Sequence, residues 1–251
     1  MPLVSTHRYR QVALVTIVTV AGMCWAWLGE MIWDMSAMPM DGTAMLPSDQ
    51  AGYVAWLVLM WLVMMVAMML PTAAPMTLAF SDFSGGRGQR SMSSLITAFV
   101  LGYVLAWGAF SLLAAAGQWS LERGELLSSM GMAFKNDVAA GGVLIIAGLY
   151  QWTPLKHACL KRCRIPIGFL MTEWRDGFSG AVIMGWRHGV FCVGCCWALM
   201  ALLFVAGVMN ALWIIGLTLF VIVEKLAPKG DLIARTAGLG LVLSGTWLIL
   251  A

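Results

Sequence analysis

Four side chains that can bind metal follow one another at helical spacing in the motif that runs from His188 to Cys196. Cys192, Cys195 and Cys196 lie four, seven and eight residues after His188, so an α-helix would carry one imidazole and three thiols on a single face. Soft thiolates select copper(I), zinc or iron–sulfur centres over hard cations. The spacing therefore predicts a soft-metal site, most plausibly for copper(I), with zinc as the other candidate.

A second cysteine pair lies upstream, where Cys159 and Cys163 are four residues apart and His157 precedes them. Both groups are expected near the cytoplasmic membrane surface, so together they could present five thiols and two imidazoles. Basic neighbours would favour the thiolate form, which binds metal. These neighbours are Lys156, Lys161, Arg162, Arg164 and Arg187. The isolated Cys24 is read as a small buried hydrophobic residue.

Methionine is the second sulfur-bearing residue type, with 20 in the chain. Met60, Met64 and Met68 repeat every four residues and would form one stripe on a helix, beside a neighbouring row of Met65 and Met69. Such a ladder of thioethers suits the stepwise passage of a soft ion. The alternative is ordinary packing, because methionine readily fills irregular helix contacts.

The segment 30–45 adds further methionines, among them Met35, Met38 and Met40, in a predicted loop on the outer side of a membrane. Thioethers cannot form disulfides, so methionine can bind a soft metal in an oxidising compartment. Nearby carboxylates such as Glu30 and Asp34 would concentrate cations there. A loop that dips Trp33 and its methionines into lipid headgroups explains the composition equally well.

Composition indicates that membrane helices must position these residues. Hydrophobic residues make up 61% of the chain and charged residues 11%, against about 45–50% and 25% in a typical soluble domain. We predict an all-α polytopic transmembrane bundle that forms a single membrane domain over 1–251, with about seven spans (six to seven). The spans are expected near 12–29, 52–70, 95–117, 138–152, 189–209, 211–224 and 233–250. Segment 166–188 is expected as an interfacial helix or a re-entrant segment.

Orientation follows from the basic residues, because cytoplasmic loops carry the excess of Lys and Arg. All 15 of them except Arg123 and Lys135 lie on the side of the N-terminus, which is therefore predicted to be cytoplasmic, with the C-terminus outside. The first span lacks a cleavage site and is read as retained. We expect a multi-pass protein of the bacterial inner membrane whose partners include the lipid bilayer and exclude nucleic acid.

Several motifs together resemble a bacterial family of predicted metal-binding integral membrane proteins, domain of unknown function 2182, whose members are sometimes described as copper chaperones. The likeness covers roughly residues 56–226. It is carried by Trp61–Pro71 with Pro75, Gly148–Gln151, Pro154–Lys156, Cys159 and Cys163 with Arg164 and Pro166, His188-Gly189, Cys192, Gly194–Trp197, Leu199-Met200 and Glu224-Lys225. The resemblance implies a metal-related role. Glu224 is a further candidate because ionisable groups at membrane depth are often functional, although a snorkelling pair with Lys225 would look the same.

Three functions remain open from the sequence. The first is a copper(I)-binding membrane protein for copper transport, delivery or homeostasis, which would exchange the ion with a periplasmic or cytoplasmic copper carrier or cuproenzyme. The second is an enzyme, a membrane thiol-disulfide oxidoreductase, and the third is a non-catalytic membrane subunit. The principal predicted ligands are Cys159, Cys163, His188, Cys192, Cys195 and Cys196, with His157, the methionines and Glu224 as additional candidates. No hydrolase or nucleotide-binding motif is present.

Overall fold

The computed structural model describes residues 2–37, 49–85, 92–128 and 132–251, and this part of the chain is helical with no strand. The all-α fold class is thereby confirmed. The helices are α1 (Pro2–Ala37), α2 (Gln50–Met69), the 3-10 helix η2 (Pro71–Ala73), α3 (Ala74–Gly85), α4 (Met92–Arg123), α5 (Asp137–Tyr150), α6 (Pro154–Arg164), α7 (Pro166–Glu173), α8 (Gly177–Ala201), α9 (Leu203–Ala206), α10 (Ala211–Leu226) and α11 (Gly230–Leu250).

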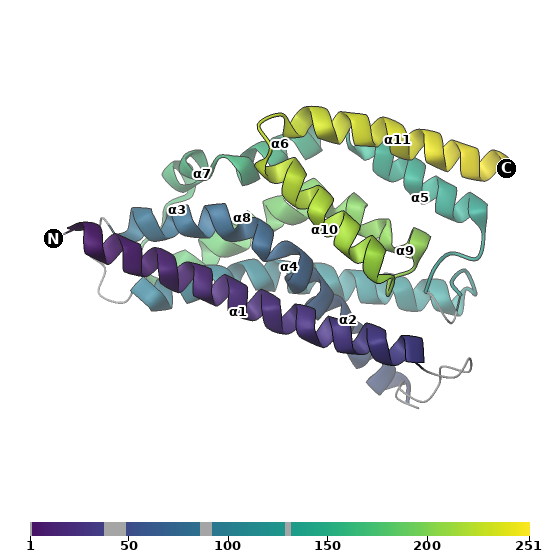
Figure 1. The fold of residues 1–251 in the computed structure, drawn as a ribbon, viewed down its shortest axis with the longest axis horizontal. Helices are drawn as coiled ribbons and strands as arrows, with labels where there is room; N and C mark the ends of the chain where they lie inside the picture. The colour runs from purple at the N-terminus through teal and green to yellow at the C-terminus, as the bar shows by residue number, and fades with distance from the viewer. Residues whose placement is uncertain (1, 38–48, 86–91, 129–131) are drawn as a thin grey trace.

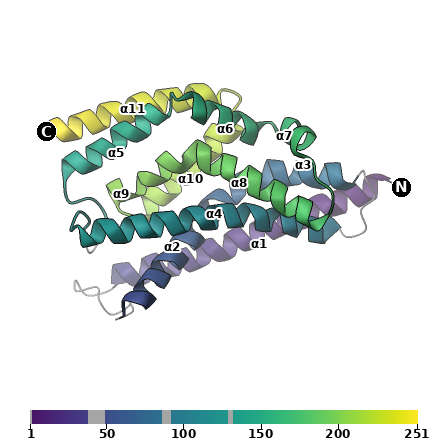
Figure 2. The same cartoon turned by 180° about the vertical axis from the view of Figure 1, so that it is seen from behind.

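The helices run along the long axis of the molecule, and the two termini lie at its opposite ends (Figures 1 and 2). Helices α5 and α11 are side by side along one edge, and α1 lies along the other edge against α2 and α3. Helices α4 and α8 lie between these edges and form the most extensive helix pair. The sulfur-bearing residues of α8 are therefore in the interior of the bundle.

Among the described residues, five helical stretches are long and apolar enough to cross a membrane. These are Tyr9–Asp34, Gln50–Met69, Met92–Arg123, Gly177–Ala206 and Gly230–Leu250. Helices α5 and α6 would add a sixth only as one span bent by 65°. Helix α10 has 16 residues and is therefore about 24 Å long, short of the ~30 Å hydrocarbon layer. The predicted count of seven spans is not confirmed.

Two predicted boundaries differ from the structure. Helix α1 continues to Ala37, so Glu30–Asp34 is helical and Met31 is buried, where the sequence predicted a loop from residue 30. Met35 is part of this helix, whereas Met38 and Met40 lie outside the described residues. Helix α8 begins at Gly177 and not at 189, so residues 177–188 of the predicted interfacial or re-entrant segment belong to this long helix, whereas 166–173 form the short helix α7.

Glycine explains the longer α8. Gly180 and Gly185 lower helix propensity, which is why the sequence pointed to a break there. Packing compensates, because a Cβ at Gly185 would lie 1.9 Å from the carbonyl oxygen of Phe99, and a Cβ at Gly102 would lie 2.1 Å from that of Val182. These glycines let the backbones of α4 and α8 touch, as small residues do between membrane helices. The close approach fixes α8 against the residues of α4.

Candidate metal site

Cys192 lies at the centre of the site, in the middle of α8, and two polar groups from other helices meet its sulfur. The Lys225 ammonium of α10 donates to Cys192 Sγ at 2.9 Å, and the Tyr103 hydroxyl of α4 lies 3.0 Å from the same atom. All three residues are buried. A buried ammonium in contact with sulfur stabilises the thiolate, the form that binds metal.

The same two groups tie the site to the end of α2. Lys225 Nζ also donates to Thr72 Oγ1 at 2.9 Å, and the Tyr103 hydroxyl donates to the Met69 carbonyl at 2.9 Å. Tyr103 has a single hydroxyl proton to share between this carbonyl and the Cys192 sulfur. A change in the protonation or ligation of Cys192 is therefore linked directly to the junction between α2 and η2.

Cys195 and Cys196 occupy the next turn of α8. Their Sγ atoms donate to the Cys192 carbonyl at 3.1 and 2.8 Å. Cys196 Sγ also lies 3.9 Å from Met69 Sδ. A thioether of α2 therefore contacts a thiol of α8, in the arrangement of two adjacent soft ligands.

Helix α6 brings the second cysteine pair to the first. The Cys163 side chain interacts with those of Cys192 and Cys195. A Cβ at Gly194 would lie 2.8 Å from Cys159 Sγ, so α6 lies against α8 where α8 has no side chain. Every one of these cysteines is a free thiol. The two cysteine groups, distant in sequence, thus form one cluster of five thiols, which we call the sulfur cluster.

The sulfur cluster is not a preformed multidentate site. Among the residues that the structure describes, no three side chains of His, Cys, Asp or Glu converge at metal-binding distances. One neighbouring pair of soft donors is Cys196 Sγ and Met69 Sδ, which are 3.9 Å apart. Such a pair suits an ion that accepts few ligands.

The two candidate histidines are placed differently. His188 is buried one turn before Cys192, where its ring packs on Phe99, Tyr103 and Phe169, and its Nδ1 has no hydrogen-bond partner among the described residues. His157 lies away from the sulfur cluster, because its Nδ1 is 3.3 Å from Asp231 Oδ1 at the start of α11. The structure thus brings one imidazole close to the thiols and not two.

The methionine stripe of α2 is in the core. Met60, Met64 and Met68 are fully buried, as are Met65 and Met69 of the neighbouring row. The thioether that contacts a cysteine is that of Met69, which the predicted ligand set did not include. Ordinary packing would also bury both rows of methionines. Their burial therefore does not decide whether the stripe is a row of metal ligands or part of the hydrophobic core.

Glu224 is held by a lysine. Its carboxylate is 2.6 Å from Lys156 Nζ, and both side chains are buried, which rules out a snorkelling pair at a surface. From the sequence, Lys156 was expected to favour the thiolate form of the cysteines. It neutralises Glu224 instead, and Lys225 contacts the sulfur. Lys225 was visible only within the Glu224-Lys225 motif, whereas nothing in a single sequence pointed to Tyr103 or Thr72.

Comparison with known proteins gives one match. A family model described as "PpoB2: Copper chaperone" matches residues 58–248, a range that includes the second part of α2, the sulfur cluster and Lys225. No curated protein and no solved structure shows a significant match.

Proposed function

The chain belongs to the PpoB2 copper chaperone family, and on this premise we propose that it is a membrane protein that binds copper(I) in the sulfur cluster and delivers it to another copper-binding protein. The observation that carries the proposal is the meeting of five thiols from α6 and α8 with the Met69 thioether inside the bundle. The protein is proposed to act without catalysis.

Ligand chemistry favours copper(I). The cluster offers sulfur donors with no carboxylate among them, since Glu224 is paired with Lys156. Thiolates and thioethers select soft ions, and thioethers in particular suit copper(I) better than zinc. Copper(I) can bind with as few as two sulfur ligands, and Cys196 with Met69 offers two adjacent sulfurs.

Cys192 is the proposed principal ligand, because the Lys225 ammonium supports its thiolate. Cys163, Cys195, Cys196 and Met69 are available as further ligands. Two sulfurs on opposite sides of one ion, each at a metal–sulfur distance of about 2.3 Å, lie about 4.6 Å apart. Cys196 Sγ and Met69 Sδ are 3.9 Å apart, so side-chain movement of less than ~1 Å would admit an ion between them.

The proposed setting is a bacterial inner membrane, in which the long apolar helices cross the bilayer and the cluster lies at depth. Support comes from the five helical stretches of sufficient length and hydropathy and from the position of Cys192 within α8. Delivery rather than storage is proposed because of the family description. The recipient would be a periplasmic or cytoplasmic copper carrier or cuproenzyme.

The test compares Cys192→Ser with Cys24→Ser in the full chain purified in detergent. Cys24 is a half-buried free thiol on α1 and is not one of the five thiols of the sulfur cluster, so it controls for the loss of one sulfur. After anaerobic loading with copper(I), we expect the wild type and C24S to retain copper against a chromophoric copper(I) chelator. C192S should bind at least about tenfold more weakly, a loss of ~1.4 kcal/mol. Copper content by mass spectrometry gives the stoichiometry.

Equal copper binding by wild type and C192S, or none in either, would overturn the proposal. The contact of Cys163 with Cys192 and Cys195 gives the oxidoreductase alternative a specific form, a disulfide between α6 and α8. Differential alkylation of the thiols before and after reduction, on protein without copper, detects that disulfide directly.

A further inference from the structure

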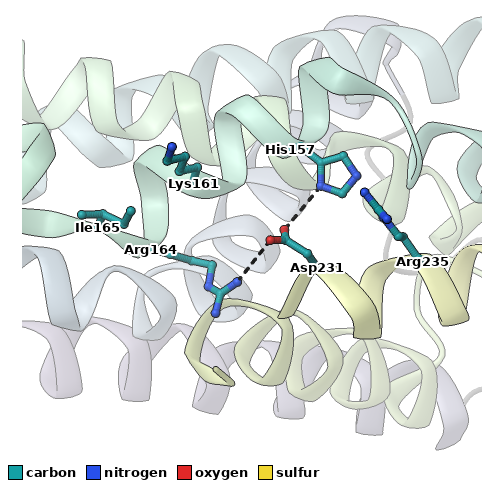
Figure 3. A pocket seen from close by; sticks show the side chains of 6 residues that line it. All are labelled: His157, Lys161, Arg164, Ile165, Asp231 and Arg235. Carbon is teal, nitrogen blue, oxygen red and sulfur yellow. Dashed lines mark hydrogen bonds and ion pairs between the residues drawn. The ribbon is translucent and has the colours of Figure 1, made fainter. Parts of the chain in front are cut away.

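A polar pocket lies on the side of α6 that faces the start of α11. Its volume is about 610 Å³, and it is lined by His157, Lys161, Arg164, Ile165, Asp231 and Arg235. Figure 3 shows Arg164 and Arg235 reaching toward Asp231 and His157 from opposite sides. On α6, the pocket residues 157, 161 and 164 are spaced by four and three, so they share one face of the helix.

The pocket carries more positive than negative charge. Lys161, Arg164 and Arg235 are the basic residues of the lining, and Asp231 is its one carboxylate. Asp231 interacts with His157 Nδ1 at 3.3 Å and with Arg164 at 4.0 Å. In the part of the chain that the structure describes, no ion pair engages Lys161 or Arg235. Two cations of the lining therefore remain for a ligand.

Arg164 is held in place by the protein. Its guanidinium donates to the Ala227 carbonyl and, at 3.0 Å, to the Pro228 carbonyl in the turn between α10 and α11. His157 Nε2 is buried without a hydrogen-bond partner, and Figure 3 shows the Arg235 guanidinium beside that edge of the ring. A fixed guanidinium and an unpartnered ring nitrogen in one cavity indicate a site with unused hydrogen-bonding capacity.

The ligand that this chemistry fits is a phosphate group. Guanidinium groups match the geometry of phosphate oxygens with two parallel hydrogen bonds, and lysine adds a point charge. The backbone N–H groups at the start of α11 add positive potential. A metal cation is excluded as an occupant by the three cations of the lining.

Apolar side chains beside the pocket indicate where the phosphate comes from. Ile165 is part of the lining and is 47% exposed. On α11, Leu232 and Leu239 flank Arg235 at spacings of three and four residues and are 56% and 53% exposed. A phospholipid whose headgroup is bound by the cations would have its acyl chains in contact with these apolar side chains.

We propose that this pocket binds a phosphate group, supplied by the headgroup of an anionic phospholipid. Basic pockets between helix ends at the cytoplasmic side of membrane proteins take such headgroups. The proposal is independent of copper, because the pocket residues lie on the side of α6 away from the thiols. Binding would stabilise the contact between α6 and α11.

Native mass spectrometry of the copper-free full chain tests the proposal, with phosphatidylglycerol, phosphatidylcholine and inorganic phosphate as separate probes. We expect the wild type to retain phosphatidylglycerol in preference to phosphatidylcholine. In the double variant Lys161→Gln/Arg235→Gln, the affinity for phosphatidylglycerol should fall about fivefold for each cation removed. The matched control, Arg123→Gln/Lys135→Gln, removes the same charge from the end of α4 and from the segment before α5, and should retain the preference.

A second variant changes the pocket in the other direction. Asp231→Asn removes the competing carboxylate and should strengthen retention of phosphatidylglycerol. Binding of inorganic phosphate that displaces phosphatidylglycerol and is lost in the double variant would support the phosphate site and assign it to a soluble source. Absence of any preference in the wild type, or equal loss in the pocket variant and its control, would overturn the proposal.

Discussion

Two buried lysines near the sulfur cluster have different partners. Lys225 donates to Cys192, and Lys156 neutralises Glu224, the residue next to Lys225 in sequence. Glu224 and Lys225 therefore attach α10 to two other helices, α6 through Lys156 and α8 through Cys192. A buried charge is tolerated when it is paired with an opposite charge. Removal of one partner leaves the other as an unpaired buried charge, which destabilises the folded state strongly.

We predict that Lys156→Met lowers the free energy of unfolding by about 3–5 kcal/mol, because Glu224 would keep a buried charge without a partner. The double variant Lys156→Met/Glu224→Gln should recover most of that loss. Thermal unfolding in detergent, followed by tryptophan fluorescence, measures both.

The control is Arg10→Met, which breaks the exposed pair between Arg10 and Asp82 at 3.9 Å. Exposed pairs contribute about 0–1 kcal/mol, so this variant should unfold close to the wild-type temperature. Equal stability of the Lys156 and Arg10 variants would contradict the role given to the buried pair.

At the scale of elements, glycine contacts decide how closely the helices approach. Gly141 and Gly148 of α5 face Gly245 and Gly238 of α11, and a Cβ at any of the four would lie 2.6–2.8 Å from an atom of the partner helix. Gly102 and Gly185 do the same for α4 and α8 and so place Tyr103 beside Cys192. These contacts make the separation between helices part of the site geometry.

We predict that Gly185→Val both destabilises the protein and weakens copper(I) binding. The added side chain cannot be accommodated at a backbone contact, and overpacking of this kind costs at least about 1–3 kcal/mol. The matched control is Gly240→Val on α11, where a Cβ would meet nothing within 4 Å. Thermal unfolding and copper retention are measured on both, and an unchanged G185V would show that α4 can move away from α8 without loss.

At the scale of the whole molecule, the arrangement of the termini bears on topology. The N-terminus of α1 and the C-terminus of α11 lie at opposite ends of the bundle (Figure 1). If the long axis stands across the bilayer, the termini lie on opposite sides of it. Helices α5 and α10, which are shorter than the five candidate spans, both contact α11.

We predict that a fluorescent protein fused before α1 fluoresces and that alkaline phosphatase fused after α11 is active, because the first reporter works inside and the second outside. Phosphatase inserted between α4 and α5 should be active, and inserted between α10 and α11 inactive, in agreement with the distribution of Lys and Arg. A C-terminus on the cytoplasmic side would contradict this topology and would require an even number of crossings.

The sequence by itself determined the features that depend on local pattern. Apolar runs predicted α2, α5, α10 and α11 to within about three residues, because hydropathy and helical length are properties of short segments, whereas α4 continues six residues past its predicted end. Helical spacing likewise predicted that His188, Cys192, Cys195 and Cys196 share one side of a helix. The boundaries of α1 and α8 were wrong, since glycines and charged residues that interrupt a pattern can still lie in a helix that tertiary packing supports.

Tertiary structure decided which groups surround the thiols. Cys159 and Cys163 meet the α8 cysteines because Gly194 leaves room for α6, and Cys192 has Lys225 and Tyr103 as its partners because α10 and α4 pack on the same turn of α8. Lys156 and His157, which precede the thiols in sequence, point to Glu224 and Asp231 instead. Contacts between distant segments depend on helix packing, and a pattern within one segment carries no information about the partner that lies across from it.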